Sequence, residues 1–499
     1  MANIIGIDLG TTFSAVAKID ETGRPVIVHN DEGQNITPSV VSIDTSGSPI
    51  VIVGQRARRE LGQPHVFHRF KRDMGTQTKY EFGGNSYTPT DLSALVLKKL
   101  VKDATKVIGK IDEVVVTIPA NFSSEAREAT MSAAVAAGLN VKHIINEPTA
   151  AALYYAFKSG GSLNGTYAVY DFGGGTFDIS IISVKEQNVE VITSNGIARL
   201  GGKDIDEKIR NRFREKYKAA TGEALDDLDF TLNDAEEEKI SLSTSHIAKK
   251  KIMRQNIVLT KIELEELIST EIAQAELLCE TTLAEANLTP DKITKVFLVG
   301  GTTRIPAIRE SVKRVFLQEP EATVNVDEVV ALGAALYAAV MSKKSGLLSA
   351  TQQAAVSQLS LQERTGKSFG TLSLITSSTR GQRQLINSII IPKNTVIPAS
   401  ETKTFTTIAD NQTNVECEIT ECGEPESDPQ FVKVIWKDML TLPAGRKAGC
   451  EIKVTYAYDD NQIMQCAFVD VESGARLDRT HKFSASIRST SPIEAFTIE

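Results

Sequence analysis

Residues Ala168–Ile182 read AVYDFGGGTFDISII, and this stretch decides the fold. A short apolar run, typical of a buried strand, ends at Asp171, and three consecutive glycines, Gly173–Gly175, begin the turn that follows. Residues Ile4–Ala17, IIGIDLGTTFSAVA, repeat the plan with Asp8 at the end of the strand. The repetition predicts two similar α/β halves whose turns surround one ligand.

The chemistry of both turns suits phosphate. Glycines at 173–175 remove every Cβ where a backbone must approach a phosphate closely, and Gly10 allows a tight turn. Thr11, Thr12 and Thr176 add hydroxyl groups, and the turns supply backbone N–H donors. The preceding carboxylates suit Mg²⁺ held through its water shell. Taken alone, the stretch Ile4–Ala17 fits an ordinary strand–turn–strand hairpin equally well.

A third stretch, VFLVGGTTRIPAI, runs a strand into Gly300, Gly301 and Arg304. Glycines there let an adenosine lie against the backbone, and a guanidinium can stack on the base. The match to the dinucleotide pattern GxGxxG is poor, because the spacing is GGTTR, and alone this stretch fits an ordinary strand and turn equally well.

Two segments rich in small residues predict helices that cross closely, as a hinge between two halves requires. They are Asn146–Ala156, NEPTAAALYYA, and Val326–Ala339, VDEVVALGAALYAA. Pro148 suits a first helical turn, and Glu147 just before it can orient a water molecule. Ordinary helix packing explains each segment alone.

Composition excludes some classes of function. The 499 residues carry 55 Lys and Arg against 63 Asp and Glu, and this net charge of -8 argues against nucleic-acid binding. We find no secretory signal and no apolar run of about 18 residues, so no membrane association is expected. Five cysteines without a disulfide or zinc spacing favour a reducing compartment, and we expect a cytoplasmic protein.

The pattern changes along the chain. Residues 1–341 alternate strands and helices, and one helix is predicted over Lys261–Ala286. Residues 342–370 are rich in Ser, Gln, Lys and Gly and predict a linker, and residues 371–499 alternate with period two. The last part predicts an antiparallel sandwich without a helical lid.

Taken in chain order, the five motifs resemble the phosphate, connecting and adenosine motifs of the actin, hexokinase and heat-shock ATPase fold. The stretches GIDLGTTFSAVA, IINEPTAAALYY, VYDFGGGTFDISI, LGGKDID and FTTIADNQTNVECEI resemble the heat-shock protein 70 (DnaK-like) chaperone family. The resemblance covers nearly the whole chain except the linker and indicates a divergent member without a lid. It implies an α/β actin-like two-lobed ATPase domain, followed by an antiparallel β-sandwich that binds substrate.

The resemblance also implies roles for residues at matching positions. The catalytic set is Asp8, Lys71, Glu147, Asp171, Thr176 and Asp178, in which Asp8 and Asp171 hold the Mg²⁺ water shell. Lys71 would contact the γ-phosphate, and Glu147 would position the attacking water. The nucleotide set is Gly10, Thr11, Thr12, Gly173, Gly174, Gly175, Gly201, Gly202, Glu236, Lys239, Ser243, Gly300, Gly301, Arg304 and Asp327.

Two further sets follow from the same resemblance. Pro119 and Arg127 match an interdomain switch pair. The peptide-cleft positions are Phe405, Ile408, Val415 and Cys417, which by their pattern alone fit one face of a core strand pair equally well.

The implied function is an ATP-dependent chaperone that uses ATP/ADP, Mg²⁺ and K⁺ and binds unfolded or extended polypeptides. The implied partners are a J-domain co-chaperone and a nucleotide-exchange factor. Three alternatives stay open: a regulatory or co-chaperone-like relative that binds ATP as a switch with little hydrolysis, an actin-like filament protein, and a sugar or acetate kinase of the same fold. The linker lacks the acidic-bounded leucine run of the family, which favours the first, while the presence of Asp8, Lys71, Glu147, Asp171 and Thr176 argues against it. No residue pattern suggests a small-molecule pocket for the last.

Overall fold

The computed structural model describes residues 3–44, 50–226, 228–321, 324–344, 346–376, 383–460, 462–479 and 496–498. The protein is a mixed α/β structure with several sheets. It divides into two compact units, which are Met1–Leu361 with Ala485–Glu499 (unit 1) and Gln362–Ser484 (unit 2). The chain therefore leaves unit 1, forms unit 2 and returns to unit 1.

The first large sheet of unit 1 has the strand order β11-β10-β1-β2-β3, with β4 also paired to β2. Strand β1 runs parallel to β10 and antiparallel to β2, so the stretch around Asp8 is a hairpin with a parallel neighbour. The strands are β1 Ile4–Asp8, β2 Phe13–Ile19, β3 Pro25–Val28, β4 Thr37–Pro38, β10 Glu113–Ile118 and β11 Val141–Asn146.

The second large sheet repeats this arrangement with the order β17-β12-β13-β14-β18. Strand β12 runs parallel to β17 and antiparallel to β13, which matches the pairing of β1 with β10 and β2. The strands are β12 Asn164–Phe172, β13 Phe177–Lys185, β14 Asn188–Ile197, β17 Lys295–Val299 and β18 Ser360–Gln362. Both aspartate turns thus lie at the same end of equivalent hairpins.

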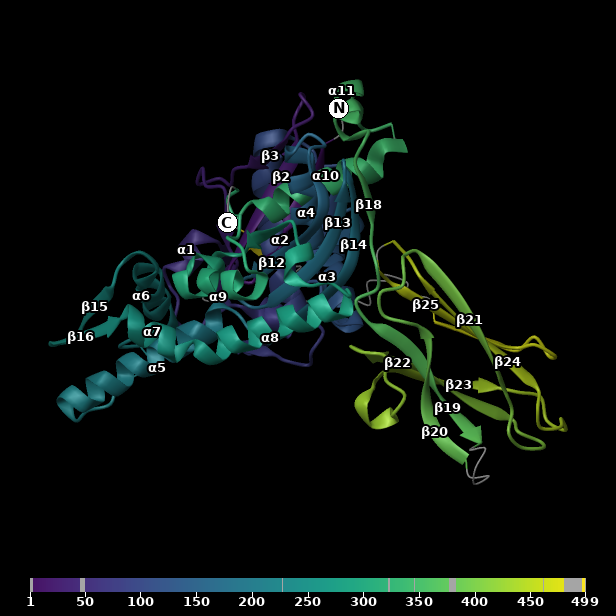
Figure 1. Cartoon of the computed structure of the whole chain (residues 1–499). Coiled ribbons are helices and arrows are strands. Elements are labelled where there is room, and N and C mark those ends of the chain that lie inside the picture. The colour runs from purple at the N-terminus through teal and green to yellow at the C-terminus, as the bar shows by residue number, and fades with distance from the viewer. Residues whose placement is uncertain are drawn as a thin grey trace. The chain divides into compact units, whose positions relative to one another are not determined.

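Helices cover both large sheets. A core of α5, α6, α8 and α9 packs on one face of the second sheet, and the hairpin β15–β16 adjoins this core (Figure 1). The α-helices of unit 1 are α1 Gln55–Arg58, α2 Pro89–Ile108, α3 Ser124–Ala136, α4 Glu147–Lys158, α5 Gly202–Thr221, α6 Leu232–Thr244, α7 Lys261–Leu267, α8 Ser269–Glu285, α9 Pro306–Phe316, α10 Val329–Met341 and α11 Ala350–Val356. Short 3₁₀ helices are η1 Phe70–Asp73, η2 Pro290–Lys292, η3 Gly301–Arg304 and η4 Ser342–Lys344.

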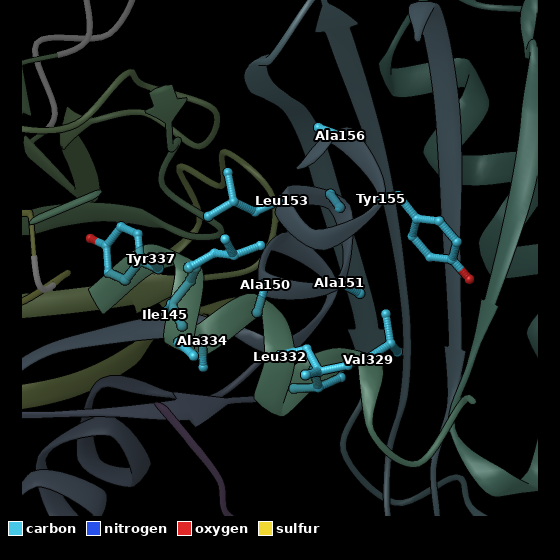
Figure 2. Close-up of a cluster of buried hydrophobic side chains, with 14 of the residues drawn as sticks. Ile145, Ala150, Ala151, Leu153, Tyr155, Ala156, Val329, Leu332, Ala334 and Tyr337 are labelled. Carbon is cyan, nitrogen blue, oxygen red and sulfur yellow. The ribbon is translucent and has the colours of Figure 1, made fainter. Parts of the chain in front are cut away.

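Helices α4 and α10 cross in the core between the two large sheets (Figure 2). A Cβ built on Gly333 would lie 1.8 Å from the backbone oxygen of Ala150, and one on Gly6 would lie 2.2 Å from the backbone nitrogen of Ala335. The small residues therefore allow the backbone of α10 to contact the backbones of α4 and β1.

A smaller sheet lies at the periphery of unit 1, with the order β27-β6-β5-β7. Its strands are β5 Val40–Asp44, β6 Ile50–Val53, β7 Val66–His68 and β27 Thr497–Ile498. Two hairpins of this unit are β8 Tyr80–Phe82 with β9 Asn85–Tyr87 and β15 Ile247–Ile252 with β16 Gln255–Thr260.

Unit 2 consists of two four-stranded antiparallel sheets that share one core. Their orders are β20-β19-β22-β23 and β21-β24-β25-β26. The elements are β19 Ser368–Thr376, β20 Arg383–Ile391, β21 Ala399–Thr406, β22 Asn414–Cys422, η5 Pro429–Phe431, β23 Lys433–Thr441, β24 Glu451–Tyr458, β25 Met464–Asp470 and β26 Arg476–Arg479. Residues 480–495 of the predicted sandwich lie outside the described part of the chain.

The structure differs from the sequence-based expectations in three places. The segment 342–370, predicted as a linker, contains α11 and β18. Val356 of α11 is buried in the core of unit 1, and Gln352 of the same helix donates hydrogen bonds to the backbone oxygens of Ile19 and Asp20. Strand β27 pairs with unit 1, although residues 371–499 were expected to form one domain. The single helix predicted over Lys261–Ala286 is two helices, because the buried Ile268 departs from helical geometry.

We predict that Gly333→Val destabilises unit 1, because the new side chain would overlap the backbone of α4. Overpacking of a core typically costs about 1–3 kcal/mol, and backbone cannot yield as a side chain can. Thermal unfolding followed by circular dichroism should show a lower midpoint. Gly423→Ala, at a glycine where a Cβ would have no atom within 4 Å, serves as the control and should leave the midpoint unchanged.

Candidate functional site

A cavity of about 680 Å³ lies inside unit 1, where the two aspartate turns converge. This volume falls within the range of about 300–1,000 Å³ that is usual for ligand sites. Nineteen of the sequence-predicted residues line it: Asp8, Gly10, Thr11, Thr12, Lys71, Glu147, Asp171, Gly173, Gly174, Gly175, Thr176, Gly202, Glu236, Lys239, Ser243, Gly300, Gly301, Arg304 and Asp327. Residues from far apart in the sequence therefore meet at one site.

The two glycine-containing turns pack directly on each other. A Cβ on Gly174 would lie 2.1 Å from Oγ1 of Thr12, and a Cβ on Gly175 would lie 2.5 Å from Oγ1 of Thr11. Gly201 has the same constraint, since its Cβ would lie 2.6 Å from the backbone nitrogen of Gly175. Because these glycines have no side chain, the two turns can pack against each other.

Three carboxylates gather at the ends of β1, β12 and β13, of which Asp171 and Asp178 are buried and Asp8 is half-buried. The Asp8 carboxylate accepts a hydrogen bond of 2.9 Å from Thr117 Oγ1, and Asp171 is the cross-strand partner of Asp178. Burial, with Glu147 adding like charge, raises the pKa of Asp8 and of Asp178 to about 7 each. The pKa of Asp171 is raised well above its ordinary value for the same reasons.

A lysine and a glutamate face these carboxylates. Lys71, on η1, donates a hydrogen bond of 2.6 Å to Oε1 of Glu147, the first residue of α4. The Lys71 side chain is only 4% exposed, and its ammonium lies 5.6 Å from the centre of the Phe122 ring. Arg69, two positions before Lys71, has a left-handed φ of 61°, which is uncommon outside glycine and marks a constrained turn.

The opposite wall comes from α6 and from the turn after β17. Lys239 on α6 pairs with Asp206 at 2.6 Å, and Glu236 pairs with Arg58 at 3.1 Å. Arg304 donates to the Asp327 carboxylate at 2.7 Å, so its guanidinium is oriented by an acid at the rim. Gly300, in the same turn, has a φ of +80°, which a residue with a side chain rarely adopts.

Asp178 and Gly201 do not line the cavity, but each forms a hydrogen bond that fixes the backbone next to residues that do. Asp178 accepts a hydrogen bond of 3.1 Å from the backbone nitrogen of Asn121, which fixes the end of β13. The backbone nitrogen of Gly201 donates a hydrogen bond of 2.8 Å to the Asp204 carboxylate, which fixes the start of α5. The two residues therefore position the lining residues beside them.

The predicted switch pair also lies outside the lining. Arg127 is buried, donates at 3.0 Å to the backbone oxygen of Ala120, and reaches Asn146 Oδ1 at 3.3 Å. Pro119 is likewise buried, and its backbone oxygen accepts from the backbone nitrogen of Phe122 at 3.2 Å. Asn146 immediately precedes Glu147, so Arg127 contacts the segment that carries the acid.

Sequence reasoning missed Asp206, which lines the cavity and binds both Lys239 and Arg69. Burial raises the pKa of Asp206 despite these two cations. Its signal lay inside the LGGKDID stretch, where an acid follows two glycines by about one helical turn. Lys203, from the same stretch, also lines the cavity.

The four cleft positions in unit 2 are divided between its two sheets. Phe405 is on β21, while Val415 and Cys417 are on β22, and Ile408 follows β21 with 40% of its surface exposed. Cys417 is fully buried in the shared core, because the alternation of β22 directs it inward, so it does not face an open cleft. Phe405 and Val415 are partly buried against that core.

The family model described as Hsp70 protein matches residues 4–82 and 76–496 of the chain. The match spans both units and includes every element that contributes to the cavity.

We predict that the protein without metal or nucleotide loses stability as pH rises from about 4 to 7. The pKa of Asp8 is about 7 in the folded protein against 3.8 ordinarily, so the folded state binds this proton more tightly and is favoured at lower pH. Asp171→Asn should flatten the dependence of the unfolding midpoint on pH, because it removes a neighbouring buried charge.

The measurement is thermal unfolding in EDTA at several pH values. Glu401→Gln, which changes an exposed carboxylate on β21, is the control and should keep the wild-type slope. Superimposable curves for Asp171→Asn and the wild type would contradict the expectation.

Proposed function

Because the chain belongs to the Hsp70 family, we propose that it binds ATP with Mg²⁺ in the cavity of unit 1 and hydrolyses the γ-phosphate. Proteins of this family are generally ATPases that act as chaperones. One observation carries the proposal. The turns that follow Asp8 and Asp171 converge on the Lys71–Glu147 pair within one cavity.

The residues present fit a nucleotide with its cation. Carboxylates with raised pKa values favour a nearby positive charge, which Mg²⁺ would supply, and K⁺ could add to it. Among the described residues, no group of three or more His, Cys, Asp or Glu is arranged to hold a metal directly. We therefore assign Asp8 and Asp171 to the Mg²⁺ water shell, which usually keeps several waters.

The side chains then divide the chemistry of phosphoryl transfer. Lys71 stabilises charge on the γ-phosphate, and Glu147 orients the attacking water and accepts its proton. The backbone N–H groups of Gly10–Thr12 and Gly173–Gly175 hold the phosphate oxygens. Glu236, Lys239 and Ser243 on α6 and Arg304 line the same cavity, and we assign them to contacts with the adenosine.

We extend the proposal to an actin-like ATPase domain in unit 1 and a substrate domain in unit 2 that binds unfolded or extended polypeptides. The two antiparallel sheets of unit 2 support peptide binding by backbone hydrogen bonds and an apolar contact. A J-domain co-chaperone and a nucleotide-exchange factor are the partners proposed on the basis of the family. No helix in the described residues is long and apolar enough to cross a membrane.

We also propose a cytoplasmic location. The five cysteines Cys279, Cys417, Cys422, Cys450 and Cys466 are all free thiols, which suits a reducing compartment.

Single-turnover ATP hydrolysis tests the catalytic assignment. Lys71→Ala should lower the rate by about 10²–10³-fold, the usual effect of removing a group that stabilises transition-state charge, and EDTA should abolish turnover. Lys110→Ala, at a lysine 89% exposed, is the matched control. A Lys71→Ala variant that turns over ATP at the parent rate would refute the assignment.

Peptide binding tests the assignment of unit 2. We predict that Ile408→Asp weakens binding of a fluorescent extended apolar peptide, since it places a charge at an exposed apolar position of the proposed cleft. Leu317→Asp, at an exposed leucine of unit 1, is the control. Equal affinities for the two variants, measured by anisotropy in ATP and in ADP, would remove Ile408 from the cleft.

A further inference from the structure

Strand β6 is covered by the last strand that the structure describes. Strand β27 runs parallel to β6, with Thr497 opposite Ile50 and Ile498 opposite Val51. Without β27, β6 would be the edge of its sheet, and its sequence IVIV is entirely apolar. An uncovered apolar edge strand is a template for pairing with other chains, so this edge requires an occupant.

An aromatic cluster beside β6 receives Phe496. The ring of Phe496 lies 6.2 Å from that of Tyr87, which is fully buried and lies 5.9 Å from Phe67. Tyr80 packs edge-on against Phe67 at 5.8 Å. These rings come from β7, β8 and β9, so Phe496 completes a cluster built by the β8–β9 hairpin and the small sheet.

Two further contacts fix the segment. Ile498 packs against the core formed by α2, α3 and the small sheet. Lys102 Nζ, on the exposed side of α2, donates a hydrogen bond of 2.5 Å to the backbone oxygen of Ile498. The segment is thus held by backbone pairing, by two apolar side chains at alternate positions and by a lysine on its backbone.

We propose that the edge of β6 is a peptide-docking site whose occupant is the chain's own segment Phe496–Ile498, bound in cis by strand addition. Backbone pairing gives affinity in this mode of recognition, and alternate side chains give specificity, here Phe496 and Ile498. The site lies apart from the nucleotide cavity, since none of these residues lines that cavity.

Docking in cis is favoured over docking on a second copy. Residues Ala485–Glu499 form one compact unit with Met1–Leu361 of the same chain. A segment tethered to its own site has an effective concentration on the order of millimolar, which exceeds the concentration of a second copy in ordinary solutions.

The test uses the full-length chain with its own segment displaced. Phe496→Asp with Ile498→Asp should open the site, and a fluorescent peptide of residues 490–499, TSPIEAFTIE, should then bind saturably by anisotropy. The wild-type chain should bind the same peptide at least about 10-fold more weakly, because its site is filled. Circular dichroism establishes that the variant is folded, and no binding to the folded variant would overturn the proposal.

A variant of the site itself distinguishes this surface from other apolar surfaces. Adding Lys102→Met to the opened chain should weaken the peptide several-fold, since one hydrogen bond to the backbone is lost. Lys110→Met is the matched control and should keep the affinity. Equal losses in both, or a loss in neither, would place the peptide elsewhere.

Hydrogen exchange provides a test that does not depend on the double variant. Phe496→Ala should increase exchange in both residues 496–498 and β6, while the wild type protects both. Sedimentation at micromolar concentration should show a monomer. Fast exchange in the wild-type segment, or a dimer that Phe496→Ala dissociates, would overturn docking in cis. None of these readouts involves nucleotide, so they are independent of the ATPase assignment.

Discussion

The backbone-to-backbone crossing of α4 and α10 is the constraint on which the arrangement of unit 1 depends. At Gly333 no side chain fits, because the position of a Cβ coincides with the Ala150 carbonyl of the other helix. Glu147 begins α4, and Asp327 lies just before α10. The crossing of the two helices therefore sets the distance between Glu147 and Asp327, which both line the cavity. The same crossing joins the cores of both large sheets, as the cluster in Figure 2 shows.

The electrostatics of the cavity explains why a cation is part of the proposed ligand. Asp171 and Asp178 are buried and Asp8 is half-buried, and loss of solvent and the like charges around them oppose their ionisation. Lys71 offsets only part of this charge, and it is already paired with Glu147. The folded chain thus maintains a cluster of acids with raised pKa values, whose ionisation a cation would favour, and such perturbed pKa values are common at functional sites.

Much of the site could be predicted from local sequence, because strand, turn and glycine signals are local. The duplicated hairpins, the residues of the two aspartate turns and the small-residue helices followed from such patterns. Lys71, Glu236, Lys239 and Ser243 were assigned only through the resemblance to the family. Asp206 was missed because its role depends on Lys239 and Arg69, which are distant in sequence. The pairing of β27 with β6 was missed for the same kind of reason, since a two-residue strand has no periodicity to detect and its partner lies far earlier in the chain. Cys417 was assigned to a cleft, but the packing of two sheets decides which face of β22 is enclosed.

The return of the chain from unit 2 to unit 1 makes unit 2 an insertion rather than an appendage. It is bounded by β18, which pairs with β14, and by the segment that ends in β27, which pairs with β6. An appended domain is released by one proteolytic cut, whereas an inserted one stays attached until both connections are cut. A force on anything that unit 2 holds is likewise divided between two anchors, because both ends of the insertion are fixed to the same body.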